Sequence, residues 1–223
     1  MCRVCVSWRD PRPGLHVYAS GVDEIGLFPL PLVLVPGEKT PLHIFEPRYR
    51  ELIGECLDED VPFGLVLADE AGMRDVGTRA AVVEVLERLP DSRLNVVVEG
   101  RERFRLVELT EGRSYATATV ADVADEPDEP SDEERARLVN AFEKVLAAAD
   151  AEVDELEGVD DLAFQIAARI DLGTDVKQGL LELTSERERV VRLSPLLDRA
   201  AEAVGRDREI RARASTNGRV EAL

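Results

Sequence analysis

The stretch LFPLPLVLVPGEKTPLHIFEPRYREL, which runs from Leu27 to Leu52, contains the most informative pattern in the chain. Its first half is almost wholly apolar, but Pro29 and Pro31 interrupt it. Proline has no N–H to donate to a neighbouring strand, so this half predicts an irregular or edge-type strand rather than a helix. Pro36 and Gly37 then mark a turn.

The second half of this stretch predicts a helix from Pro47, because proline fits the first helical turn. Glu46 precedes it as a candidate N-cap. Glu46, Arg48 and Arg50 are expected to hold the strand–helix junction through a charge-assisted pair. The apolar residues that follow have helical spacing and predict one buried face; they are Tyr49, Leu52, Ile53, Cys56 and Leu57.

Several short runs rich in Val, Leu or Ile follow this helix, and turn residues separate them. Many short strands in series are typical of an antiparallel barrel or sandwich. The predicted strands are Phe63–Ala68, Ala80–Leu89, Leu94–Val98, Phe104–Leu109 and Tyr115–Val123. Arg101, Arg103 and Arg105 lie among them and are interpreted as an ordinary solvent face of a strand.

The composition changes at DEPDEPSDEE, residues 125 to 134, which predicts a solvated acidic linker. Ser131 and Glu134 have the spacing of a capping box that starts a helix. Three further helical patterns follow, at 162–170, at 176–181 and at 190–204. A second capping box at Ser185 and Glu188 opens the last one, and Pro195 is expected to kink or restart it.

Strands first and helices second predict an α+β protein rather than an alternating parallel sheet. The predicted organisation is a loosely held tail at 1–24, a β-rich domain at 25–124, the acidic linker at 125–132, a helical bundle at 133–204 and an Arg-rich tail at 205–223.

The charge balance limits the classes of partner. The net charge is −18, which disfavours binding to nucleic acid or to a membrane surface, because phosphates are repelled. Three cysteines give no disulfide framework and fit a reducing cytoplasm. No apolar run approaches the length of a membrane span, and no signal peptide is expected.

Catalytic and metal-binding patterns are weak. The nearest match to a phosphate-binding loop has Thr78 where the lysine must be. His16 and His43 are the only histidines, and His43 sits between apolar neighbours as a structural histidine would. Cys2 and Cys5 have the spacing of half a zinc site, without a second half. We therefore expect no catalytic residue, no metal and no cofactor.

Two motifs resemble the amino-terminal, substrate-binding domain of Lon proteases. The first is Leu27 to Leu52, quoted above, and the second is NVVVEGRERFRLVEL, Asn95 to Leu109. The helical segments DVKQGLLEL and SERERVVRLSPLL also resemble that family. The resemblance extends from Ile25 to Val204. It implies a PUA-like antiparallel β pseudo-barrel followed by an all-α helical bundle.

The resemblance also implies recognition of polypeptide substrates in a proteolytic system. Because the chain ends where the Lon ATPase would begin, we expect a stand-alone, non-enzymatic module that acts as a cytoplasmic adaptor or regulator in protein quality control. The expected partner is an unfolded or extended polypeptide, with a Lon protease as a further candidate. The alternative is an RNA-binding protein, because PUA-like barrels also bind RNA; a hydrolase with unrecognised residues is a lesser third option.

The binding residues are expected around the prolines of the first motif and in the second motif. Most of the apolar ones are expected in the core, and any that reach the surface would form an apolar patch of the kind that marks a partner site. The candidates are Phe28, Pro29, Leu30, Pro31, His43, Phe45, Glu46, Arg48, Tyr49, Arg101 and Phe104.

Overall fold

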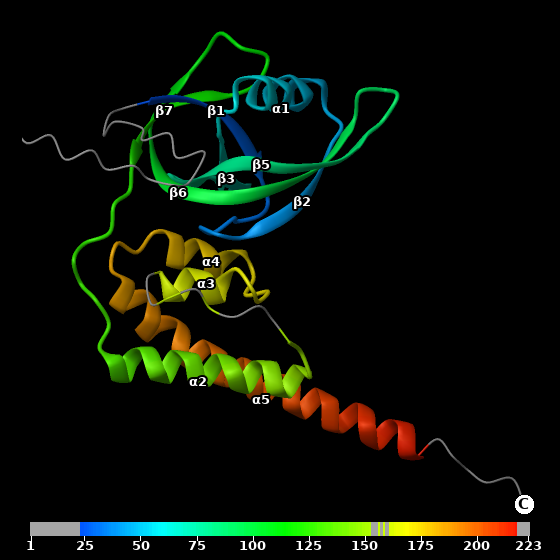
Figure 1. Cartoon of the computed structure of the whole chain (residues 1–223), viewed down its shortest axis with the longest axis vertical. Coiled ribbons are helices and arrows are strands. Elements are labelled where there is room, and N and C mark those ends of the chain that lie inside the picture. Colours follow the sequence, from blue (N-terminus) through cyan, green and yellow to red (C-terminus); the bar gives the residue numbers. More distant parts are fainter. Residues whose placement is uncertain (1–22, 153–155, 157, 159–160, 218–223) are drawn as a thin grey trace, which may run out of the picture.

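The computed structural model describes residues 23–152, 156, 158 and 161–217. Of the tail expected at 1–24, residues 1–22, which include Cys2, Cys5 and His16, lie outside this range. Figure 1 shows a group of strands with one helix, joined by an extended segment to a second group made of helices. No helix in the described ranges has the length and apolarity of a bilayer span.

Five strands close into a ring. β1 pairs with β7 in antiparallel and with β3 in parallel, which closes the order β1-β7-β6-β5-β3 on itself. This confirms the predicted β pseudo-barrel, with one parallel pairing in an otherwise antiparallel sheet. The strands are β1 (Asp23–Leu30), β3 (Phe63–Asp69), β5 (Val76–Arg88), β6 (Leu94–Thr110) and β7 (Thr117–Asp122).

Two strands lie outside the ring. β2 (Lys39–Ile44) pairs with β6 alone, and β4 (Gly72–Met73) pairs with β3 alone. A long β6 makes this possible, because β2 and β7 pair with different halves of it while β5 lies along its other side. Within residues 23–152, 156, 158 and 161–217, β2 therefore has no strand partner on its outer side.

The proline-broken strand is accommodated in the ring because each half of β1 has its own partner. Residues 23–26 pair with β7, and residues 27–30 pair with β3. Pro29 lies in the second half, opposite Val66, where no other strand of the described residues pairs with β1 on its second side. The prediction of an irregular or edge-type strand is thus confirmed: β1 is a strand that changes partner halfway along its length.

Helix α1 (Pro47–Glu59) packs on the ring with the predicted apolar face inward: Tyr49, Leu52, Ile53 and Cys56 are buried. Glu46 occupies the N-cap position, but its side chain forms no capping hydrogen bond. It accepts instead from Arg48 Nε at 2.9 Å, whereas Arg50 donates to the carbonyl of Asp91 at 2.7 Å. The predicted charge-assisted pair therefore forms between Glu46 and Arg48 alone.

The second motif is explained by close packing. The ring of Phe104 lies over Gly64 and Gly77, where added Cβ atoms would come within 2.9 Å and 2.6 Å of its Cζ atom. Gly100 lies against the main chain of Val35, whose carbonyl oxygen would be 2.3 Å from an added Cβ. Gly100 lies between the part of β6 that pairs with β2 and the part that pairs with β7. Its close approach to Val35 lets it form backbone hydrogen bonds with Gly37 and Glu38.

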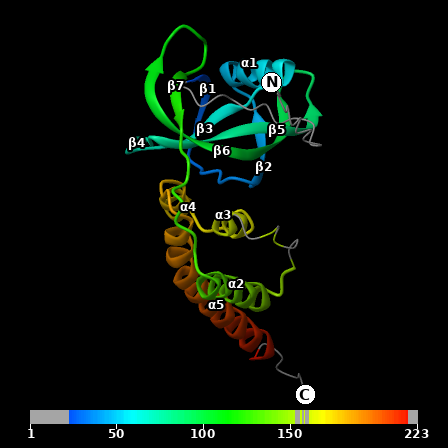
Figure 2. The ribbon, with the colours of Figure 1, turned by 60° about the vertical axis from the view of Figure 1, so that its left-hand side comes forward.

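The second group consists of α2 (Asp132–Ala149), α3 (Leu162–Ala167), α4 (Thr174–Leu181) and α5 (Glu186–Asn217). Ser131 and Glu134 form the predicted capping box. Pro195 lies inside α5, which does not restart there, and Ser194 donates to the carbonyl of Val190 instead of capping a new helix. α5 continues beyond Gly205 to Asn217, where a tail was expected, and its last part projects away from the strands (Figures 1 and 2).

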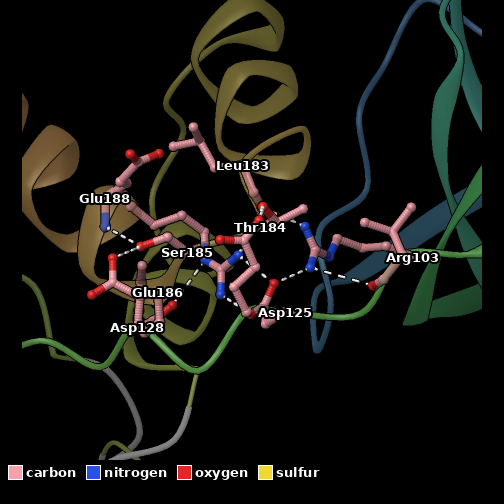
Figure 3. Close-up of polar contacts among 12 residues, drawn as sticks. Arg103, Asp125, Asp128, Leu183, Thr184, Ser185, Glu186 and Glu188 are labelled. Carbon is pink, nitrogen blue, oxygen red and sulfur yellow. Dashed lines mark hydrogen bonds and ion pairs between the residues drawn. The ribbon is translucent and has the colours of Figure 1, made fainter.

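A buried charge cluster joins the two groups (Figure 3). Arg103 of β6 is 5% exposed and donates to the carbonyls of Leu181 and Leu183, at 2.9 Å and 2.6 Å. Asp125 forms ion pairs with both Arg103 and Arg189, and the latter is fully buried in α5. The interpretation of Arg103 as part of a solvent face was therefore wrong, because its strand faces the helices.

Part of the acidic segment that contains Asp125 contacts the helical group, although most of its residues are exposed. Glu126 N donates to the carbonyl of Thr184, and Ser185 Oγ donates to Asp128 at 2.7 Å. A separate ion pair joins Lys177 of α4 to Glu38 at 2.6 Å. The predicted acidic linker is thus mostly exposed, but Glu126 and Asp128 also bond to the turn between α4 and α5.

Candidate functional site

The outer face of the β2–β6–β5 sheet carries side chains in regular rows, because the register of three strands places them opposite each other. His43 of β2 faces Asn95 of β6, which faces Glu87 of β5. In the next row, Pro41, Val97 and Glu84 occupy the corresponding positions. The intervening residues of β6, including Val96 and Val98, point inward and are fully buried.

A chain of hydrogen bonds crosses the first row. His43 Nδ1 lies 2.6 Å from Asn95 Oδ1, and Asn95 Nδ2 donates to Glu87 Oε2 at 2.9 Å. Since an amide oxygen only accepts, this contact places a proton on His43 Nδ1. The three side chains therefore hold each other in fixed positions on an exposed surface.

Apolar side chains surround this polar row. Phe45 follows β2, is 59% exposed and stacks on the His43 ring with centroids 5.9 Å apart. On the other side, Leu86 of β5 is 53% exposed. Irregularities in the β5–β6 register, between Val82 and Glu84 and between Val85 and Glu87, explain why Val83 and Leu86 are exposed.

These residues form a shallow groove of about 490 Å³, lined by Pro41, Leu42, His43, Leu86, Glu87 and Asn95. The groove is lined by residues of β2, β6 and β5, and β2 forms the edge of this part of the sheet in the described part of the chain. Pro41, in the middle of β2, fits the preference of proline for edge strands. A shallow groove with an apolar rim beside a free strand edge is suited to an extended chain.

The remaining predicted residues are divided between the core and the surface. Phe28 and Tyr49 are buried and pack on each other with centroids 4.0 Å apart. Phe104 is fully buried, so it cannot contact a partner and its selection as a binding residue was wrong. Pro29 and Leu30 are half-buried, Pro31 is exposed, Arg101 is exposed in an ion pair with Glu99, and Glu46 and Arg48 form the pair at the start of α1.

The sequence-based prediction missed Leu86, Glu87 and Asn95. Asn95 belongs to the quoted second motif, but only the pairing register brings it beside His43. Leu86 lies in a run of β-forming residues, where a register irregularity cannot be recognised from composition. His43 was interpreted as a packed or hydrogen-bonded structural histidine, and its exposed ring is the hydrogen-bonded kind.

Two other hollows have less suitable linings. One of about 300 Å³ lies between α2 and α5, beside Val191 and Pro195, and has no strand edge. Another of about 360 Å³ lies beside α1, where Glu55 accepts hydrogen bonds from Arg113 and Tyr115, so its polar groups bond to each other. Among the described residues, no group of three or more His, Cys, Asp or Glu side chains could hold a metal ion.

The model of the ATP-dependent protease La (LON) substrate-binding domain matches residues 24–199. This chain belongs to that family. The match includes the ring, α1 and most of the helical group, so the two groups of elements together make up the Lon substrate-binding domain.

Curated relatives of this Lon substrate-binding domain are Lon proteases. The Lon protease of Parabacteroides distasonis is 28% identical over 217 residues, which cover 84% of this chain and 26% of the relative. The Lon protease of Escherichia coli K12 is 30% identical over 208 residues, which cover 85% and 26%. The chain thus spans about a quarter of the length of these relatives.

Solved structures agree on the fold. A Lon N-terminal domain protein from Xanthomonas campestris has a TM-score of 0.60 at 23% identity and covers 77% of this chain and 96% of its own. The N-terminal domain of the Mycobacterium avium complex Lon protease has a TM-score of 0.60 at 18% identity, with 78% and 98% covered. These likenesses confirm the predicted α+β architecture.

Proposed function

We propose that this Lon substrate-binding domain binds extended, apolar-containing polypeptide along the groove and free edge formed by β2, β6 and β5. The observation that carries the proposal is a pair of exposed apolar side chains: Leu86, which lines that groove, and Phe45, which stacks on the lining residue His43. An extended chain would lay alternate side chains against this rim while its main chain approaches the unpaired side of β2.

The adaptor role is part of the same proposal. A domain that holds an unfolded segment weakly could deliver it to a Lon-type protease or regulate that delivery in the cytoplasm. We propose no catalysis by this chain, because Thr78, at the position of the phosphate-loop lysine, is fully buried and donates to the carbonyl of Leu34. Neither ATP hydrolysis nor casein cleavage is expected.

Titration of a permanently unfolded, alkylated model polypeptide tests the proposal. We expect binding in the micromolar range or weaker, about −8 kcal/mol or less in magnitude. Contacts with an apolar rim should persist as salt rises, whereas binding to phosphates falls steeply with salt. Single-stranded RNA should not bind at physiological salt.

Paired variants locate the site. The double substitution Phe45→Ala and Leu86→Ala should weaken polypeptide binding by about tenfold or more, since it removes both sides of the rim. The matched control is Val107→Ala with Leu109→Ala, which truncates two equally exposed apolar residues on the other half of β6. Equal weakening by both pairs would contradict the proposed site. Sub-micromolar RNA binding with a steep salt dependence would favour the RNA-binding alternative instead.

A further inference from the structure

Glu87 is the only acidic side chain that lines the groove within the described residues, and its position is fixed. Asn95 donates to its Oε2 atom, and His43 holds Asn95 in turn. Among the described residues, Glu87 has no ion pair with a basic side chain. An exposed carboxylate held in place beside an apolar rim is prepared to accept hydrogen bonds from a cation.

The neighbouring row extends this arrangement. Glu84 faces Val97, two residues along β6 from Asn95, so the rows of Glu84 and Glu87 are about 7 Å apart. That spacing equals the distance between alternate side chains of an extended chain. The nearest bases on these strands belong to other rows: Lys39 faces Glu99, and Arg88 faces Leu94.

The exposed ring of Phe45 adds a second feature that favours a cation. It stacks on His43, the first member of the polar row that ends at Glu87. A guanidinium or ammonium group attracted to Glu87 would approach a groove that also offers an aromatic face. The net charge of −18 would attract such a segment from a distance.

We infer that the polypeptides preferred at this groove carry a basic side chain two positions from an apolar one. The apolar side chain contacts Leu86 or Phe45, and the basic one pairs with Glu87. This inference rests on the proposed function and names the class of segment that the same site selects. It predicts that the groove binds apolar–basic segments more tightly than apolar–acidic segments of equal hydrophobicity.

Three unstructured, fluorescently labelled peptides test the inference by anisotropy at low salt. They share the same apolar residues and differ only at the alternate positions, which carry arginine, glutamine or glutamate. The parent protein should bind the arginine peptide about tenfold more tightly than the glutamate peptide. Glu87→Gln should reduce this ratio to about threefold or less, because it removes the charge that separates the two peptides.

Glu143→Gln is the matched control, because it removes the same charge from an exposed position on α2. It should preserve the preference for the arginine peptide. A preference that survives Glu87→Gln, or that Glu143→Gln reduces equally, overturns the inference and leaves the proposed function standing. Failure of the parent to bind any of the three peptides overturns both.

Discussion

Individual charged residues fix the relation between the strands and the helices. Burial lowers the pKa of Arg103, and attraction by Asp125 acts against that effect. Both Arg103 and Arg189 also lie over the ring of Phe164, at 5.5 Å and 4.4 Å from its centroid. Because two buried cations share Asp125, the loss of that carboxylate would leave both without their common anion.

Asp125→Asn should therefore reduce the free energy of unfolding by about 2–4 kcal/mol, because breaking a buried pair leaves uncompensated charge. Urea titration followed by circular dichroism measures the change. Glu129→Gln is the control, since Glu129 pairs with Arg135 on the surface and should cost less than about 1 kcal/mol. An Asp125 variant as stable as the parent would mean that the cluster adds no stability.

Cys56 allows a prediction about pH. Burial, with smaller contributions from Glu55 and Glu59, raises the pKa of its thiol to about 12. In a Cys2→Ser, Cys5→Ser background, iodoacetamide should alkylate Cys56 slowly at pH 8 in the folded state and rapidly in denaturant. Fast alkylation without denaturant would contradict this burial.

The raised pKa of Cys56 also predicts how the stability of the folded state changes at alkaline pH. Since the folded-state pKa lies above that of a free thiol, the group favours the folded state below about pH 8.5. That contribution is lost as the pH rises toward the folded-state value. Cys56→Ala should remove this part of the alkaline loss of stability.

At the scale of elements, glycines show where two chain segments must approach closely. Gly100→Ala should destabilise the protein by about 1–3 kcal/mol, because the new Cβ would overlap the carbonyl of Val35 and part β6 from the turn before β2. Gly54→Ala is a sharp control, since nothing lies within 4 Å of its added Cβ in α1. It should stabilise the protein by about 0.5–1 kcal/mol. Thermal unfolding of the two variants should shift in opposite directions.

Features that depend on residues close together in the sequence were predictable from the sequence alone. The buried face of α1 and the capping box at Ser131 depend on residues within a turn or two of each other, and the structure confirms both. Contacts that depend on the pairing register of the strands or on distant helices were not predictable from the sequence. The row of His43, Asn95 and Glu87 requires three strands to pair in one alignment, and the burial of Arg103 requires helices some eighty residues later.

Helix α5 shows another limit of sequence patterns. Beyond Gly205 its sequence lacks an apolar stripe, which predicted a tail. Alanine, arginine and glutamate have high helix propensity, however, and that propensity does not require a buried face. The projecting end of α5 is consistent with helix formation that does not depend on packing.

At the scale of the whole molecule, several contacts couple the strands to the helices. Val33, Val35, Leu67 and Val76 share an apolar core with the helices, and Gln178 of α4 donates to the carbonyl of Val76. The Asp125 cluster and the pair of Lys177 with Glu38 add two ionic contacts. We expect one cooperative unfolding transition, in which strand and helix amides lose protection from hydrogen exchange at the same denaturant concentration.

Combining Asp125→Asn with Lys177→Met should broaden or split this transition, because it weakens both ionic contacts and leaves the shared apolar core and Gln178 to couple the two groups. Lys144→Met is the control: Lys144 pairs with Asp198 inside the helical group, so its loss should leave a single transition. Two transitions in the parent protein would show that the groups are independent from the start.

The closed ring also has a consequence for the order in which the chain is made. β1 leaves the ribosome first, yet one of its partners is β7, which ends at Asp122. At the usual rate of synthesis, β1 waits on the order of ten seconds for this partner. Arg103 then waits for the carbonyls of Leu181 and Leu183. During this delay the newborn chain exposes an apolar segment of the same kind that we propose the finished domain binds, which makes it prone to aggregation until the ring closes.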